Sequence, residues 1–127
     1  MTNERSRILV VDDEPEILSL VADIFTPSGY EVTTVTAASE ALMLVQTAAP
    51  DVILLDIGMP DMDGYALIKT LRAMSEKDGG RTPAVALTAF ARSEDRRQAM
   101  LAGFDVHVAK PVEPGELVAV VSRLASR

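Results

Sequence analysis

Short runs of apolar and β-branched residues alternate along the chain with longer segments in which apolar residues recur every three or four positions. We expect the short runs to be strands and the longer segments to be amphipathic helices. The five expected strands lie at residues 7–11, 31–35, 52–55, 84–88 and 105–109. Because strands and helices alternate throughout, the pattern predicts an α/β domain built on a parallel sheet with helices on both faces.

The expected strands differ in how their apolar residues are arranged. Residues 52–55 are all apolar, which is typical of a central strand that is buried on both faces. Residues 31–35 alternate between polar and apolar side chains, as in a strand at the edge of a sheet. The expected helices lie at residues 15–28, 39–47, 64–74, 93–102 and 114–124.

Length and composition narrow the class of protein. A chain of 127 residues forms one domain, since domains commonly hold roughly 100 to 150 residues. It contains no cysteine, which excludes disulfide frameworks and thiolate metal sites, and we expect a cytoplasmic location. A net charge of −7 disfavours direct binding to nucleic acids. No apolar run approaches the roughly 20 residues that cross a membrane, and the polar N-terminus is unlike a signal peptide.

Side chains that could bind a metal ion or take part in a reaction lie at the ends of the expected strands. Asp12 and Asp13 follow the first strand, Asp56 the third, Thr88 ends the fourth and Lys110 follows the fifth. In an open α/β sheet the ligand crevice lies beyond the carboxyl ends of the strands, so these side chains should meet there. Three carboxylates without histidine or cysteine suit a hard divalent cation, and Mg²⁺ fits best.

Each of these residues also has an ordinary structural explanation. Taken singly, Asp12 or Asp13 could cap a helix and Asp56 could belong to a turn. Thr88 could be a hydrogen-bonded strand-end hydroxyl, and Lys110 a solvated surface lysine. Caps and turns together hardly explain why four separate strand ends carry, in order, an acid pair, an acid, a hydroxyl and an ammonium group. The joint pattern therefore favours a functional site.

The motifs around these residues resemble those of the receiver domains of two-component response regulators, and the resemblance spans essentially the whole chain. The matching segments are ILVVDDEP at 8–15, DVILLD at 51–56, MPDMDG at 59–64, LTA at 87–89 and AKP at 109–111. The resemblance implies a flavodoxin-like fold, a five-stranded parallel sheet in the order 2-1-3-4-5. It also implies a cis peptide bond between Lys110 and Pro111.

The resemblance implies a role for each carboxylate. Asp56 would be the phosphoacceptor, receiving a phosphoryl group from a histidine of a sensor kinase or of a phosphotransfer protein. Asp13 and Asp56 would bind Mg²⁺ directly together with the Gly58 carbonyl, and Asp12 would act through water. Such a domain would catalyse only its own phosphorylation and dephosphorylation.

The resemblance also assigns Lys110 and Thr88 to the phosphoryl oxygens, as a charge clamp and a hydroxyl donor. The switch would couple Thr88 to a residue three positions before the lysine, where the family usually has Tyr or Phe and this chain has His107. Histidine is smaller in apolar area and can be charged near pH 6.5. Gly58 and Phe90 occupy positions that tune the lifetime of the phosphorylated state in related domains.

The expected partners follow from the same resemblance. They are a histidine kinase or histidine phosphotransfer protein, and a second receiver bound through the last two helices. Arginines at or near these helices either serve such contacts or form an ordinary solvated charged face. These arginines are Arg92, Arg96, Arg97 and Arg123. We expect residues 1–127 to be a single receiver domain without an output domain. Such a chain is either a single-domain regulator or a receiver from a hybrid kinase, and residues 79–83, 91–97 and 107–111 favour the hybrid kinase.

Two functions of other classes compete with this interpretation. A Mg²⁺-dependent phosphohydrolase with an aspartyl-phosphate intermediate usually carries Asp-x-Asp at one strand end, whereas Gly58 lies two residues after Asp56, and Glu14 two after Asp12. A flavin-binding module would need a phosphate loop after the first strand, where this chain has acidic residues that repel phosphate. Both matches are poor.

Overall fold

The computed structural model describes residues 6–58, 64–89 and 93–125. Its five strands form one parallel sheet in the order β2-β1-β3-β4-β5, as predicted. The strands are β1 (Arg7–Val11), β2 (Glu31–Val35), β3 (Val52–Asp56), β4 (Ala84–Thr88) and β5 (Val106–Ala109). The central strand is β3, whose residues are all buried, and the partly polar β2 lies at one edge.

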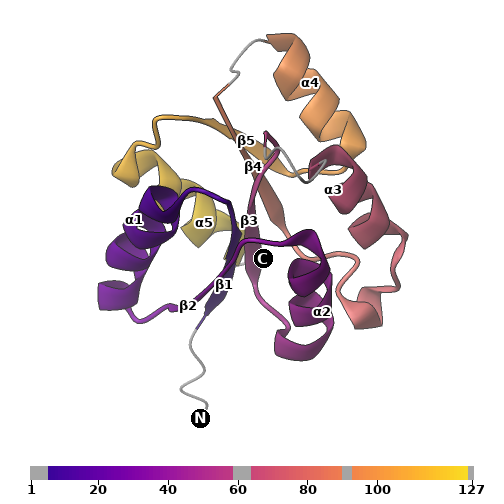
Figure 1. The fold of residues 1–127 in the computed structure, drawn as a ribbon, viewed down its shortest axis with the longest axis horizontal. Helices are drawn as coiled ribbons and strands as arrows, with labels where there is room; N and C mark the ends of the chain where they lie inside the picture. Colours follow the sequence, from indigo (N-terminus) through magenta and orange to yellow (C-terminus); the bar gives the residue numbers. More distant parts are fainter. Residues whose placement is uncertain (1–5, 59–63, 90–92, 126–127) are drawn as a thin grey trace.

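Five helices cover the sheet on both faces. They are α1 (Pro15–Phe25), α2 (Ala38–Ala48), α3 (Gly64–Ala73), α4 (Ser93–Ala102) and α5 (Pro114–Ala125). Helices α1 and α5 cover one face, whereas α2, α3 and α4 cover the other (Figure 1). None of the helices in the described ranges is both long and apolar enough to cross a membrane.

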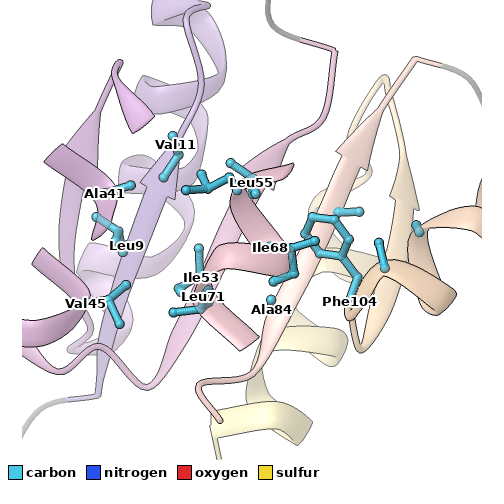
Figure 2. Close-up of a cluster of buried hydrophobic side chains, with 14 of the residues drawn as sticks. Leu9, Val11, Ala41, Val45, Ile53, Leu55, Ile68, Leu71, Ala84 and Phe104 are labelled. Carbon is cyan, nitrogen blue, oxygen red and sulfur yellow. The ribbon is translucent and has the colours of Figure 1, made fainter. Parts of the chain in front are cut away.

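Alternate residues of each central strand supply the two halves of the core. On one face, Leu9, Ile53 and Leu55 pack with Ile68 and Leu71 of α3, as Figure 2 shows. The residues between them along the strands point to the other face and pack against α1 and α5. The strand residues of this half include Ile8, Val10, Leu54, Val85 and Leu87, and the helices contribute Phe25, Leu117 and Val121. The uniformly apolar strands are therefore explained by burial on both faces.

Helix α4 packs less extensively than the other helices. It buries only Ala99 and Ala102, while Met100 is 46% exposed and Leu101 is 78% exposed. The apolar surface that an alanine buries is small, so its contribution to packing is small too. Displacement of α4 therefore costs less free energy than displacement of a helix anchored by leucine and valine.

The element boundaries differ from the expectations at a few positions. The first helix ends at Phe25 and continues as a 3₁₀ turn, Thr26–Ser28, because Pro27 has no N–H to donate. Strand β3 extends through Asp56, which pairs in register with Leu87. The predicted cis peptide bond between Lys110 and Pro111 is confirmed.

Candidate functional site

The strand register brings the predicted site residues to one edge of the sheet. Asp56 ends β3 and Thr88 ends β4, while Asp12 and Lys110 directly follow β1 and β5. The backbone N–H of Lys110 donates to the Thr88 carbonyl at 2.7 Å, which continues the pairing of β4 with β5 beyond the last strand residue. Asp12, Asp56 and Thr88 are all buried. The meeting of these side chains at the carboxyl edge is therefore confirmed.

The Lys110 ammonium group lies among three carboxylates. Its Nζ is 3.1 Å from Asp12 Oδ2, 3.3 Å from Asp56 Oδ2 and 2.7 Å from Glu14 Oε1. The lysine side chain is 12% exposed, so it is not a solvated surface residue. This arrangement holds a positive charge next to Oδ2 of Asp56.

Glu14 is a site residue that the sequence did not reveal. It directly precedes α1, a position where acidic residues are common because they interact favourably with the positive end of a helix dipole. Its side chain instead reaches Lys110, which is 96 residues away along the chain. The available signal was its place in the run Asp12–Asp13–Glu14, which puts a third acid at the same strand end.

Backbone hydrogen bonds orient the two buried carboxylates. The Glu14 N–H donates to Asp12 Oδ1 and the Gly58 N–H donates to Asp56 Oδ1, both at 2.9 Å. Each bond joins an aspartate to the N–H two residues later, a common turn geometry for this residue type. As a result, one oxygen of each carboxylate is fixed by backbone and the other faces Lys110.

Burial and neighbouring charge shift the ionisation of this cluster. Burial raises the pKa of Asp12 to about 6, although the Glu14 N–H and Lys110 lower it, and the Asp56 charge raises it further. Burial alone would lower the pKa of Lys110. Its hydrogen bonds to Glu14 and Asp12 and the charges of Asp12 and Asp56 outweigh that effect, so its pKa is raised. Lys110 is therefore a permanent cation at neutral pH.

The carboxylates form a set that fits a hard divalent cation. One oxygen from each of Asp12, Asp13, Glu14 and Asp56 lies within 4.8 Å of the others, and Asp13 is exposed to solvent. Mg²⁺ prefers oxygen ligands and usually keeps several waters, which an exposed edge of this kind allows. The donor set therefore fits the predicted Mg²⁺. Gly58 lies next to Asp56 through its N–H bond, and the expected role of its carbonyl stays a prediction.

The structure describes some of the remaining predicted residues, while others lie outside the described ranges. His107 is half-buried on β5 and pairs in register with Ala86 of β4, while Thr88 pairs with Ala109. Arg96, Arg97 and Arg123 are exposed on α4 and α5. Phe90, Arg92 and residues 59–63 of the MPDMDG motif lie outside the described residues.

Comparison with known proteins agrees with this geometry. The family model for the response regulator receiver domain matches residues 8–122. An uncharacterised 14.6 kDa protein from Leptolyngbya boryana is 41% identical over 91% of this chain and 87% of its own length. The response regulator SaeR from Staphylococcus epidermidis is 35% identical over 96% of this chain, which spans about half (51%) of that relative.

A solved structure is similar to nearly the whole chain. The receiver domain of a sensor histidine kinase from Pseudomonas aeruginosa matches with a TM-score of 0.85 and 31% identity, covering 98% of this chain and all of that one. That structure has a magnesium ion coordinated in its active-site cleft. Receiver domains are phosphoacceptors that bind Mg²⁺ at an acidic site and interact with histidine kinases or phosphotransfer proteins. The present chain belongs to the response regulator receiver domain family.

Proposed function

We propose that Asp56 is the phosphoacceptor of this receiver domain. The observation that carries the proposal is the environment of its carboxylate, which is buried at the end of β3 with Oδ1 bonded to the Gly58 N–H and Oδ2 at 3.3 Å from Lys110. The ordinary explanation, a solvated turn aspartate, does not account for a buried carboxylate beside a lysine. Among the described residues, Asp12 is the other buried aspartate, but its side chain is 0% exposed, whereas that of Asp56 is 7% exposed and is therefore more accessible to a phosphodonor.

The transfer itself requires mainly positioning and charge neutralisation. A carboxylate oxygen of Asp56 forms a bond to phosphorus while the bond from phosphorus to the donor's histidine nitrogen breaks. The imidazole leaves with the electron pair and takes up a proton from solvent. Lys110 neutralises the transferring oxygens, and the Thr88 hydroxyl donates a hydrogen bond to one of them.

The proposal gives the metal site to Asp13, Asp56 and the Gly58 carbonyl, with Asp12 acting through water. Bound Mg²⁺ would neutralise negative charge on the transferring phosphoryl oxygens. The cluster of Asp12, Asp13, Glu14 and Asp56 supports this assignment because its oxygens can converge on one cation. Asp13 is the exposed member of the aspartate pair and so leaves room for water ligands.

Thr88 and His107 are proposed as the switch that carries the phosphorylation signal to the surface formed by α4, β5 and α5. Thr88 ends β4 next to the site, and His107 lies on the adjacent strand, two residues before Ala109, the register partner of Thr88. The weak anchoring of α4 supports this path, since a helix held by two alanines moves at low cost. Arg96, Arg97 and Arg123 are exposed there, which supports a protein partner or a second receiver at this surface.

The phosphodonor in this proposal is a histidine kinase or a histidine phosphotransfer protein in the cytoplasm, and the domain catalyses no reaction besides its own phosphorylation and dephosphorylation. Support for the donor comes from the family to which the chain belongs and from the magnesium-containing receiver of a sensor kinase to which it is similar. That receiver is part of a kinase, which favours the hybrid-kinase origin.

Incubation with acetyl phosphate and Mg²⁺ followed by intact-mass measurement tests the proposal. Wild type should gain one phosphoryl group, and EDTA or Asp56→Asn should abolish the gain. Asp23→Asn, which changes an exposed aspartate of α1, is the matched control and should be phosphorylated like wild type. A full gain in Asp56→Asn would overturn the assignment.

A further inference from the structure

The Lys110 ammonium group has three protons and three carboxylate neighbours. It donates to Glu14 Oε1 at 2.7 Å and to Asp12 Oδ2 at 3.1 Å, and it forms an ion pair with Asp56 Oδ2 at 3.3 Å. An ammonium group has three donors and no acceptor. For Lys110 to bind a phosphoryl oxygen, at least one of these three contacts has to weaken.

The three carboxylates differ in their access to water. The side chain of Asp12 is 0% exposed and that of Asp56 is 7% exposed, whereas that of Glu14 is 54% exposed. Loss of the lysine would leave Asp12 as a buried charge without its cation, which is costly. Water can replace the lysine at Glu14, because that carboxylate already lies at the surface. Glu14 is therefore the partner that Lys110 can release at the lowest cost.

We propose that the ion pair between Glu14 and Lys110 is a latch that holds Lys110 in the unphosphorylated domain and competes with the phosphoryl group for it. The inference rests on the proposed function, in which Asp56 accepts that group. In this account Glu14 is a positioning residue that acts through Lys110. Its carboxylate also lies close enough to the incoming dianion to oppose it by like-charge repulsion.

The backbone around Glu14 fixes the latch in place. Glu14 precedes α1 in an extended conformation and is followed by Pro15, and its N–H is bonded to Asp12 Oδ1. The side chain therefore starts from a fixed point while its carboxylate lies at the surface. A change confined to the side chain removes the ion pair and leaves this backbone hydrogen bond in place.

The latch can be tested with beryllofluoride, a stable mimic of a phosphoryl group that binds an aspartyl carboxylate. We would titrate wild type, Glu14→Gln and Glu14→Asp by calorimetry at saturating Mg²⁺, so that metal affinity does not limit binding. Glu16→Gln is the control, since it removes an exposed acid of α1 and changes net charge by the same amount. The ¹⁵N resonance of the Lys110 ammonium group would report its partners directly.

We expect Glu14→Gln to bind beryllofluoride about three- to fivefold more tightly than wild type, which is the range of a partly exposed ion pair. Glu14→Asp, whose shorter side chain withdraws from Lys110, should fall between the two, and Glu16→Gln should match wild type. The Lys110 resonance should shift in metal-free Glu14→Gln and stay unchanged in Glu16→Gln. A merely structural role would not move either readout in this order.

The outcomes separate this inference from the proposed function. If wild type binds no beryllofluoride and Asp56→Asn behaves the same, the assignment of Asp56 fails. If wild type binds it, Asp56→Asn does not, and Glu14→Gln has the wild-type affinity, the latch alone is overturned. Equal tightening in Glu14→Gln and Glu16→Gln would also overturn the latch, since net charge would then explain the effect.

Discussion

Charged side chains gather at both ends of the sheet, and the two clusters differ in their balance of charge. At the amino edge, before β4 and β5, Arg72 faces Asp105. At the carboxyl edge, Lys110 forms ion pairs with Asp12, Glu14 and Asp56, and Asp13 belongs to the same group of carboxylates. The first cluster holds an arginine paired with an aspartate, whereas the second holds an excess of negative charge.

Arg72 makes most of the hydrogen bonds of the amino-edge cluster. The Arg72 guanidinium donates to the carbonyls of Gly103 at 2.9 Å, Gly80 at 3.0 Å and Thr82 at 2.6 Å, and to Asp105 Oδ2 at 3.0 Å. Asp105 Oδ2 also accepts from the Ala84 N–H at 2.8 Å. These bonds join α3 to the connections that lead into β4 and β5. A partly buried network of this kind stabilises the fold.

The carboxyl-edge cluster is incomplete without further positive charge. Its carboxylates lie within 4.8 Å of one another with a single ammonium group among them, so mutual repulsion raises the free energy of the metal-free fold. A divalent cation relieves this repulsion. An excess of negative charge thus coincides with the edge where we propose the phosphoacceptor site, whereas the charges of the opposite edge are paired.

The largest effect is expected at the balanced cluster. Arg72→Leu should lower the free energy of unfolding by about 2 to 4 kcal/mol, because it leaves Asp105 and several carbonyls without their donor. Urea denaturation followed by circular dichroism measures this change. Arg72→Lys keeps the positive charge but not the planar guanidinium group, so its free energy of unfolding should fall by less than that of Arg72→Leu. A change within about 0.5 kcal/mol for Arg72→Leu, the range of ordinary surface substitutions, would remove the contrast between the two edges.

Mg²⁺ should stabilise the protein through the unbalanced cluster. At a concentration one hundred times the dissociation constant, ligand linkage gives about 2.7 kcal/mol, visible as a higher melting temperature. Asp13→Asn should stabilise the metal-free protein and remove most of the Mg²⁺ effect, whereas Asp23→Asn should retain it. A melting temperature that does not respond to Mg²⁺ would show that these acids are not a metal site.

Asp12 should make the metal-free protein less stable as pH rises. Its pKa is about 6 in the folded state and about 3.9 when unfolded, so the folded state binds more protons between these values. Stability due to this group is therefore lost from about pH 4 to pH 6. In EDTA at pH 7.5, the free energy of unfolding of Asp12→Asn should exceed that of wild type by about 1 to 2 kcal/mol. This gain is smaller than the full pKa shift implies, because the variant also loses the ion pair with Lys110. Equal stability of the two proteins at both pH 4 and pH 7.5 would contradict this account.

The smallest effect is expected at His107, which lies between the two clusters on β5. In the proposed switch the His107 ring moves inward, where the protonated form is disfavoured, so partner binding or dimerisation by the phosphorylated domain should weaken by about two- to threefold from pH 7.5 to 5.5. His107→Tyr should reduce this dependence. The measurement is sedimentation or titration with the partner at the two pH values. Identical pH profiles of wild type and His107→Tyr would exclude this role.

The strands, the helices and the sheet edge at which the acids meet could all be predicted from the sequence. Alternating burial explains the apolar runs, and strand ends of a parallel sheet necessarily share an edge. The strand order came from the family motifs, because hydrophobic periodicity does not specify which strands are neighbours. The Glu14–Lys110 pair and the Arg72 network could not be predicted, because both depend on contacts between residues far apart in the sequence. Glu14 and Lys110 are 96 positions apart, and Arg72 and Asp105 are 33 positions apart. An acid before a helix and an arginine near its end are equally well explained by the helix dipole.

The most direct test of the central claim is to locate the phosphoryl group chemically. Sodium borohydride reduces an aspartyl phosphate to homoserine, which peptide mapping by mass spectrometry identifies at the modified position. After phosphorylation with acetyl phosphate and Mg²⁺, we predict homoserine at Asp56 and at no other aspartate. Homoserine at Asp12 or Asp13 with none at Asp56 would contradict the account.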